Sequence, residues 1–404
     1  MKMLIISQYY PPEIGAAATR WSEYSQILTD LGHDVTILTE LPNYPSGIIA
    51  EGYPKYWFYE DERKSKSPRI IRVPVWANSR KTTVQRLGFY TSFMLSATVR
   101  SLILPKFDVI IVSSPPLFVG FIATFLRPFK RAKYILDLRD IWPESAQVLG
   151  EIKSNYILAL GRLMERIVYR SVDAFFLAVP GFKSYLDEQH SSHLAKEKLD
   201  LINGVSNSFI GILKEKQSTL RSKQFTVLFS GNLGLAQGLE TVLEAAAKLS
   251  GKDILFKIIG DGAKKEELVK YANSLKLNNV TFISSMTRDL LVDHILSAHI
   301  CLVPLVKSPL FLNAIPSKMF EYMAAGKPVV VGIRGEVEGV LRSSRAGVSI
   351  EPGDATELSK SIQAYADNSE RVEAEGLAGQ DYILSGMTKE GIMQNVLKRL
   401  FEQV

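Results

Sequence analysis

A helix start near residue 316 carries the residue types that a phosphate site needs. A strand-like run ends at Pro304, a loop follows, and Pro316 or Ser317 opens a helix. The unpaired N–H groups of a first helical turn, together with the helix dipole, attract anions. Lys318 adds a mobile positive charge at the same place. The segment therefore predicts a receptor for a diphosphate.

Glu321 lies one helical turn beyond Lys318 and on the same face of the predicted helix. Its carboxylate is positioned to accept hydrogen bonds from ribose hydroxyls, which makes a nucleotide the expected ligand. The alternative is that Glu321 is only a surface residue of this helix.

A second polar segment, residues 137–144, follows a predicted buried strand. It contains four ionisable side chains within eight residues, beside a tryptophan: Asp137, Arg139, Asp140, Trp142 and Glu144. Functional sites gather titratable groups in this way. We expect the segment to bind an acceptor substrate, with Arg139 and Asp140 joining Lys318 nearest to the chemistry. The alternative is a loop whose charges only cap helices and pair with one another.

Small residues follow several predicted strands. Gly231 follows one strand, and Gly260-Asp261-Gly262 follows the next. Near the N-terminus, Gly15 ends a proline-containing loop and is followed by three alanines. Small residues allow a backbone to approach a ligand closely. No Gly-x-Gly-x-x-Gly follows the first strand, which argues against a dehydrogenase.

Apolar runs alternate with helical patterns along the whole chain. The strand-like runs are 3–6, 35–38, 70–75, 109–112, 134–136, 174–177, 225–229, 255–259, 280–282, 300–304 and 329–331, and the helical patterns include 19–31, 84–104, 156–170, 238–249, 264–275, 290–298, 317–325 and 389–401. Alternation of this kind predicts parallel sheets with right-handed crossovers, and ligands of such sheets bind beyond the carboxyl ends of the strands.

We therefore expect an α/β protein with two doubly wound, Rossmann-like domains that face a central cleft. The predicted first domain is 1–205 and the second is 206–386, with a polar linker at 212–224. The C-terminal helix, 387–404, is expected to pack back on the first domain.

The positive charge is concentrated in the first half. Residues 50–135 hold fifteen Lys or Arg and five Asp or Glu, a local +10 in a chain of net charge +6. An anionic partner is one explanation, and a solvated basic surface is the other. Apolar runs at 87–95 and 117–126 lie beside basic residues, which favours docking on an anionic membrane. The open alternative is that 117–126 is a core-facing crossover helix.

Other features predict a cytoplasmic protein without a metal or cofactor. The chain has one cysteine, Cys301, so it forms no internal disulfide. The apolar stretch near the N-terminus is too short for a signal peptide, and no run is long enough to span a membrane. The five histidines show no metal-ligand spacing.

With these motifs in place, the chain resembles glycosyltransferase family 4, whose members have the GT-B fold. The matching signature is a helix with a glutamate, Glu321, followed by Met323-Ala324-Ala325-Gly326-Lys327-Pro328. The resemblance covers essentially the whole chain. It implies that Gly15 lies over the donor phosphates, that Gly262 belongs to a donor-side turn, and that Met286 and Arg288 belong to a rim around the base.

Three positions depart from the family pattern. A first glutamate eight residues before Glu321 is replaced by Asn313, and a basic pair after the second domain's first strand is replaced by Asn232 and Gln237. The resemblance still places all three in the donor site. We expect the triplet Pro316-Ser317-Lys318, with Arg288, to supply the missing charge at the diphosphate.

The resemblance implies a metal-independent, retaining transferase that moves a sugar from a nucleotide-diphosphate donor, with UDP expected, and uses no cofactor. The run Asp140-Ile141-Trp142-Pro143-Glu144 is similar to a subgroup that transfers N-acetylated amino sugars, fucosamine among them, to lipid-linked saccharides in O-antigen or capsule synthesis. Two alternatives stay open: a non-catalytic sugar-nucleotide-binding relative, and an epimerase with the same fold. Nucleic-acid binding is disfavoured because no recognised module is present.

Overall fold

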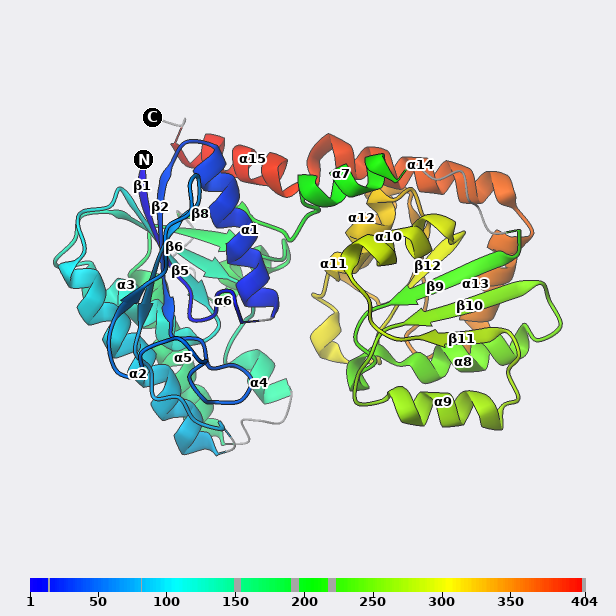
Figure 1. The fold of residues 1–404 in the computed structure, drawn as a ribbon, viewed down its shortest axis with the longest axis horizontal. Coiled ribbons are helices and arrows are strands. Elements are labelled where there is room, and N and C mark those ends of the chain that lie inside the picture. The colour runs from blue at the N-terminus through cyan, green and yellow to red at the C-terminus, as the bar shows by residue number, and fades with distance from the viewer. Residues whose placement is uncertain (14, 81, 149–153, 190–195, 217–222, 402–404) are drawn as a thin grey trace. The chain divides into compact units, whose positions relative to one another are not determined.

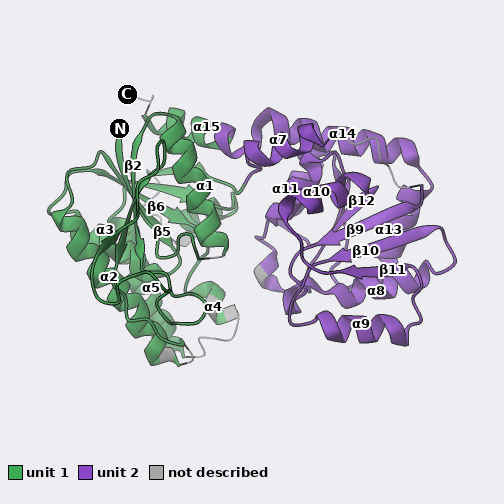
Figure 2. Ribbon diagram, viewed as in Figure 1, with its two compact units in different colours: residues 1–203, 392–404 green, residues 204–391 purple. Residues whose placement is uncertain are grey.

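A computed structural model describes residues 1–404 except 14, 81, 149–153, 190–195, 217–222 and 402–404. The chain forms two compact units, the first made of residues 1–203 and 392–404 and the second of 204–391 (Figure 2). Each unit is a mostly parallel sheet with helices around it (Figure 1). The predicted α/β class with two doubly wound sheets is confirmed.

Unit 1 contains an eight-stranded sheet of order β3-β4-β2-β1-β5-β6-β7-β8, in which only β3 is antiparallel to its neighbour. Its strands are β1 (Lys2–Ile6), β2 (Asp34–Glu40), β3 (Tyr59–Glu60), β4 (Arg69–Val73), β5 (Val109–Ser114), β6 (Lys133–Leu138), β7 (Ala174–Leu177) and β8 (Glu197–Asp200). Its helices are α1 (Ala16–Asp30), α2 (Thr83–Ile103), α3 (Leu117–Leu126), α4 (Glu144–Val148), α5 (Asn155–Arg170) and α6 (Phe182–Gln189).

The local sequence explains these elements. Every residue of β5 is buried, as expected for a central parallel strand covered on both faces. α2 begins with a capping box, in which the Gln85 N–H donates to the Thr82 hydroxyl at 3.2 Å and the Thr82 N–H donates to the Gln85 side chain at 3.3 Å. α2, α3 and α5 contribute to one apolar core with alternate residues of the central strands.

Unit 2 contains a six-stranded parallel sheet of order β11-β10-β9-β12-β13-β14. Its strands are β9 (Phe225–Ser230), β10 (Ile254–Ile259), β11 (Val280–Ile283), β12 (Ile300–Pro304), β13 (Val329–Gly332) and β14 (Gly347–Ser349). Its helices are α7 (Asn207–Glu215), α8 (Leu239–Lys248), α9 (Lys265–Ser274), α10 (Arg288–Ser297), α11 (Ser317–Ala324), α12 (Glu336–Ser344), α13 (Ala355–Ala366) and α14 (Ser369–Gly386).

The last helix, α15 (Lys389–Phe401), crosses from unit 2 into unit 1. Near the boundary of unit 2, the two chain segments that lead to unit 1 are hydrogen-bonded, because Val205 donates to the Met387 carbonyl at 3.0 Å and accepts from Lys389 N–H at 2.8 Å. Within unit 1, Lys133 Nζ donates to the carbonyl of Leu400 at 2.9 Å, which holds the end of α15.

Two expectations need correction or refinement. The predicted polar linker at 212–224 is wrong in part, because 212–215 belong to α7, where Phe209, Ile210 and Leu213 are buried. Residues 217–222 lie outside the described part of the chain. The apolar run 117–126 is α3, and six of its ten residues are buried in the core of unit 1. The core-facing alternative for this run is therefore correct for most of its length.

Candidate functional site

The loops after β9 and β10 are pressed together at the carboxyl edge of the unit 2 sheet. The Gly231 N–H donates to the Ile259 carbonyl at 2.9 Å, and the Leu233 N–H donates to the Asp261 backbone carbonyl at 2.9 Å. A Cβ at Gly260 would lie 1.9 Å from the Gly231 carbonyl oxygen, and one at Gly262 would lie 2.4 Å from that of Leu233. Both positions also have positive φ, so glycine is required there.

Lys318 reaches across to this pair of loops from the first turn of α11. Its Nζ donates to the Ser230 carbonyl at 3.0 Å and lies 4.4 Å from the centre of the Phe229 ring. A Cβ at Gly231 would stand 2.5 Å from this nitrogen, so the missing side chain leaves room for the ammonium group. Burial lowers the pKa of Lys318 to about 8, with Glu321 opposing the shift.

The start of α11 presents an uncapped helix end beside Lys318. Pro316 is the N-cap and supplies no side-chain hydrogen bond, while Ser317 is exposed at the first helical position. The first N–H groups of a helix have no carbonyl acceptor within it. These groups and the lysine form a positive surface at the carboxyl edge of the sheet, between the ends of β9 and β12.

Glu321 and Arg288 meet as an ion pair between α11 and α10. The Arg288 guanidinium also lies over the Phe209 ring, 4.7 Å from its centre. Both charged side chains keep contact with solvent, with 31% of Glu321 and 43% of Arg288 exposed. Met286 is half-buried in the loop just before α10. The two residues assigned to ribose and diphosphate are thus brought together.

The three positions that depart from the family pattern differ in their surroundings. Gln237 turns onto its own loop, because its side-chain oxygen accepts from the Gly234 N–H at 3.1 Å. This hydrogen bond stabilises the loop that precedes α8. Asn232 is exposed, and its amide lies against Gly234 and Gly262. Asn313 is exposed in the loop before α11.

In unit 1, the structure places Asp137 in a buried network instead of at a surface. The carboxylate is fully buried and accepts hydrogen bonds from Arg20 at 2.7 Å, Trp21 Nε1 at 2.9 Å and Ser113 Oγ at 2.9 Å. Arg20 is buried as well and also donates to Asn203. The expectation that Asp137 contacts the acceptor is therefore wrong. Its carboxylate instead links β6 to α1 and β5 through these hydrogen bonds.

Three other residues of the predicted acceptor segment contact neighbouring parts of unit 1. Asp140 accepts from the Ile141 N–H and from Ser145 Oγ, both at 2.9 Å, and so caps the turn into α4. Trp142 packs against Gly161 of α5. Glu144 pairs with Arg162 of α5 at 2.9 Å. The charge-pairing alternative thus describes these side chains in the structure.

Arg139 differs from its neighbours in this segment. Its Nη2 donates to the Pro115 carbonyl at 2.5 Å, while its buried Nε has no hydrogen-bond partner among the described residues. Burial lowers the pKa of Arg139, with Asp137 opposing the shift. The Nε lies 3.8 Å from the Asp137 carboxylate, so Arg139 is a second cation beside the buried Asp137.

The loop that contains Gly15 leads directly into α1. Gly15 is its exposed N-cap and provides no side-chain hydrogen bond. The neighbouring residues Ala16 and Ala17 leave the helix start uncovered by long side chains. The role of this loop over donor phosphates stays a prediction that rests on its small residues.

Sequence reasoning missed a buried polar cluster at the carboxyl ends of β1 and β2. Glu40 is fully buried and accepts from Gln8 Nε2 at 2.9 Å and Asn43 Nδ2 at 2.7 Å. Burial, together with the nearby Glu13, raises the pKa of Glu40. Glu13 accepts from the backbone N–H groups of Asn43 and Tyr44, both at 2.9 Å. The available signal was the position of two polar residues at strand ends, with Gln8 just after β1 and Glu40 at the end of β2.

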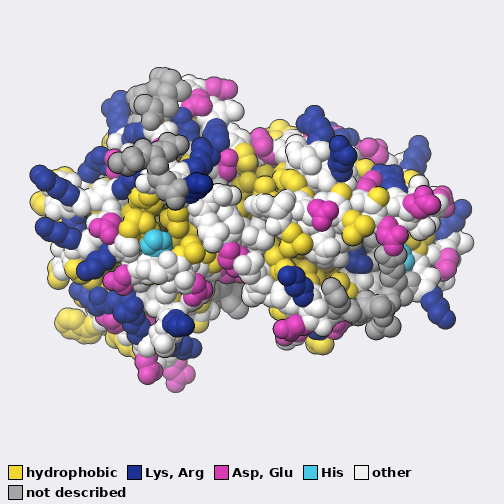
Figure 3. Space-filling model, turned by 90° about the horizontal axis from the view of Figure 1, so that it is seen from above, with side chains coloured by type: hydrophobic (Ala, Val, Ile, Leu, Met, Phe, Trp, Pro, Cys, Tyr) yellow, Lys and Arg dark blue, Asp and Glu magenta, His cyan; other side chains and the backbone are white. Residues whose placement is uncertain are grey.

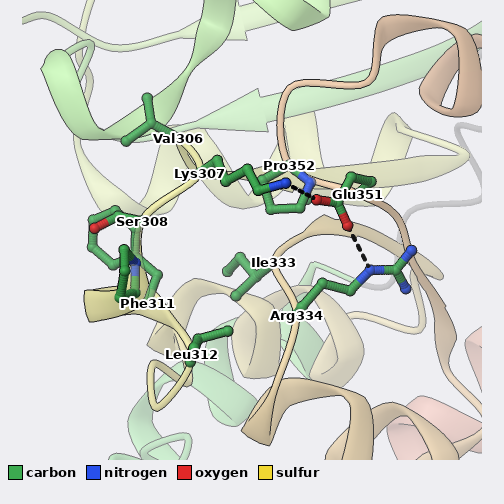
Figure 4. Close-up of a pocket in the computed structure, with 11 residues that line it drawn as sticks. Val306, Lys307, Ser308, Phe311, Leu312, Ile333, Arg334, Glu351 and Pro352 are labelled. Carbon is green, nitrogen blue, oxygen red and sulfur yellow. Dashed lines mark hydrogen bonds and ion pairs between the residues drawn. The ribbon is translucent and has the colours of Figure 1, made fainter.

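Figure 4 shows a cavity of about 220 Å³ beyond the ends of β12 and β13. Its walls are largely apolar, with Phe311, Leu312 and Ile333 among them. The charged groups around it are already paired, since Glu351 accepts from Lys307 at 2.7 Å and from Arg334 at 3.4 Å. A sugar diphosphate needs unpaired polar partners, so we do not assign the donor to this cavity.

No group of three or more His, Cys, Asp or Glu side chains suited to a metal ion occurs within the described ranges. In the same part of the chain, no helix is both long and apolar enough to cross a membrane.

Comparisons with known proteins agree with this architecture. Residues 15–200 match the family described as "Glycosyl transferase 4-like domain", and residues 212–379 match "Glycosyl transferases group 1". The putative colanic acid biosynthesis glycosyl transferase WcaI of Escherichia coli is 26% identical over 365 residues, which cover 87% of this chain and 88% of that protein.

Solved structures share the fold over the full length. Sucrose-phosphate synthase from Thermosynechococcus elongatus covers 100% of both chains with a TM-score of 0.75 and 17% identity. Anabaena Alr3699/HepE, in complex with UDP and glucose, covers 100% of both with a TM-score of 0.69 and 14% identity.

Proposed function

We propose a donor and an acceptor for this chain, which belongs to the glycosyltransferases of the GT-B type. The proposed donor is a UDP-sugar that carries an N-acetylated amino sugar such as L-fucosamine. The proposed acceptor is a polyprenyl-linked saccharide in bacterial O-antigen or capsule synthesis, used at the inner face of the cytoplasmic membrane. A relative named for colanic acid biosynthesis and a structural neighbour in complex with UDP support this direction.

The observation that carries the proposal is Lys318 at the uncapped start of α11. Its ammonium group lies in the space left by Gly231, and the start of its helix has no side-chain cap. A diphosphate placed there would meet a helix dipole and a cation. These would compensate for the two basic residues of the family pattern that positions 232 and 237 lack. Arg288 is the second cation, because its partner Glu321 can turn to ribose hydroxyls when a nucleotide binds.

The proposed chemistry is retention of the anomeric configuration without a covalent protein intermediate. The leaving diphosphate takes the acceptor proton on the face from which it departs. The protein holds donor and acceptor in the orientation that the reaction needs. It also stabilises the negative charge that grows on the diphosphate as the bond between sugar and diphosphate breaks. Arg139 and Asp140 belong to the acceptor side of this proposal, in which Asp140 keeps its place as the cap of the turn into α4.

Donor-dependent transfer tests the proposed function. The purified protein would be incubated with a radiolabelled UDP-N-acetyl sugar and a bacterial lipid extract, and the label followed into the lipid fraction. Transfer supports the proposal. UDP binding without transfer would indicate the binding-only relative, and conversion of the sugar nucleotide without an acceptor would indicate the epimerase.

Transfer is expected to need no divalent metal ion, since Lys318, Arg288 and helix N–H groups meet the diphosphate charge. Activity measured with excess EDTA should equal activity measured with added Mg²⁺ or Mn²⁺. Loss of activity in EDTA, with recovery on adding metal, would show that this assignment of charge is wrong.

Glu321→Ala is expected to weaken donor binding about ten- to a hundredfold. A hydrogen bond to a charged group contributes about 1.5–3 kcal/mol, and the ribose contact is present before and during the reaction. Calorimetric titration with UDP measures the change, with the exposed Glu266 of α9 replaced by Ala as control. Unchanged UDP affinity would mean that Glu321 only holds Arg288.

A further inference from the structure

One face of α5 exposes a row of apolar side chains to solvent. Tyr156, Leu160, Leu163 and Ile167 recur at the spacing that places residues on one helix face, and all four are exposed, Tyr156 by 80%. The opposite face is buried in the unit 1 core and includes the apolar Leu158, Val168 and Tyr169 together with Gly161 and Glu165. α5 thus has apolar side chains on its exposed face as well as on its buried face, whereas a surface helix normally exposes a polar face.

The neighbouring helices of unit 1 extend this apolar surface. α3 packs against α2 on one side and α5 on the other (Figure 1). On α2, Leu95, Val99 and Leu102 share one face and are exposed. On α3, the exposed Phe125 packs against the half-buried Phe121, with ring centres 6.2 Å apart. Exposed apolar side chains gathered on three neighbouring helices are typical of an interaction site.

The charge of this face is positive. Within α2, α3 and α5 the only acidic residue is Glu165, which is buried, 1% exposed. Arg166 and Arg170 are exposed beside the apolar stripe of α5, and Arg131 is exposed after α3. Figure 3 shows Lys and Arg side chains on unit 1 when the molecule is seen from above, so positive charge is not confined to these three helices. An apolar surface bordered by arginines, on three helices whose single carboxylate is buried, complements an anionic lipid bilayer.

We propose that the outer face of α2, α3 and α5 docks on an anionic membrane, with the exposed side chains of α5 inserted between lipid headgroups. This inference rests on the proposed lipid-linked acceptor and specifies which surface of unit 1 brings the enzyme to it. The exposed side chains of α5 replace the apolar run 117–126 as the main membrane contact, because most of α3 is buried.

The structure also decides which basic residues can test the docking. Arg127 pairs with Asp173 at 2.7 Å, and Lys130 donates to the carbonyls of Leu104 and Pro105, so replacing either disturbs the fold. Arg131, Arg166 and Arg170 are better choices because they are exposed.

Vesicle co-sedimentation tests the proposal with the full-length protein. Wild type should bind phosphatidylcholine vesicles that contain phosphatidylglycerol at low ionic strength, and should bind pure phosphatidylcholine vesicles weakly. The variant Leu160→Gln/Leu163→Gln should lose roughly tenfold in partitioning for each leucine. The variant Arg131→Gln/Arg166→Gln/Arg170→Gln should lose roughly fivefold for each arginine, and only on anionic vesicles. A matched control, Leu377→Gln/Leu384→Gln, changes two exposed leucines of α14 and should bind as wild type does.

Two outcomes overturn the docking surface. One is equal partitioning of wild type and the α5 leucine variant. The other is a wild-type dimer in sedimentation velocity that the leucine variant breaks while neither protein binds vesicles, which would make this face a contact between copies. UDP titration of the same proteins separates the two proposals: intact UDP binding with no vesicle binding removes only the docking, and vesicle binding without UDP binding removes only the proposed donor.

Discussion

Replacing Lys318 by Met is expected to lower the turnover number about 100- to 1,000-fold, the usual effect of removing one donor that stabilises transition-state charge. Negative charge on the diphosphate grows as the glycosidic bond breaks, so the lysine matters more in the transition state than in the bound donor. The affinity for UDP should therefore fall much less than the turnover number. Methionine keeps an apolar stem over the Phe229 ring, which limits damage to the fold.

The pH dependence gives Lys318 a second signature. Its pKa is lowered to about 8 by burial, so the free enzyme carries the charged form below this pH and loses it as the pH rises further. Wild-type kcat/KM should fall about tenfold per pH unit above this pKa, since kcat/KM reports groups of the free enzyme. The methionine variant should lack this step.

The control for both measurements is Lys270→Met, which removes an exposed lysine on α9 of the same unit. It should retain wild-type turnover and the wild-type pH profile. A Lys318→Met enzyme with turnover near wild type would contradict the role of this lysine at the diphosphate.

Asp137→Ala is expected to destabilise unit 1 by about 3–5 kcal/mol, because it leaves the buried guanidinium of Arg20 without its counter-charge. The substitution also removes the acceptor for Trp21 Nε1 and Ser113 Oγ. All four tryptophans, Trp21, Trp57, Trp76 and Trp142, belong to unit 1. Urea unfolding followed by tryptophan fluorescence therefore reports on this unit.

Glu60→Ala serves as the matched control in the same sheet. Glu60 pairs with Arg69 at 2.7 Å, but both side chains are partly exposed, so the expected loss is at most about 1 kcal/mol. If Asp137→Ala unfolded no more easily than Glu60→Ala and instead lost acceptor binding, Asp137 would belong to the acceptor site and not to the scaffold.

Much of the fold could be predicted from the sequence because the elements are long and strongly patterned. Helix 156–170 is an example: its spacing was clear, and α5 spans Asn155–Arg170. Its orientation could not be predicted, because periodicity shows that apolar residues share a face but not whether that face meets the core. Leu163 and Ile167 face solvent, while the polar Glu165 lies inside.

In the candidate site, too, local sequence predicted some features and not others. Lys318 and Glu321 stand on a helix start after a strand, so local sequence was enough to place them. The role of Asp137 depends on Arg20, 117 residues earlier, and no local pattern reveals that pairing. The cluster of Glu13 and Glu40 was missed for a similar reason, since the two carboxylates come from different strand ends.

The most direct test of the account is differential scanning calorimetry of wild type and the Lys318→Met/Glu321→Ala variant with UDP, GDP and dTDP. A ligand at 100 times its dissociation constant stabilises a protein by about 2.7 kcal/mol. The account predicts that UDP stabilises wild type to this extent, and that the variant needs at least tenfold more UDP for the same shift. Absence of stabilisation by all three nucleotides, or equal UDP stabilisation of both proteins, would contradict a donor site at the start of α11.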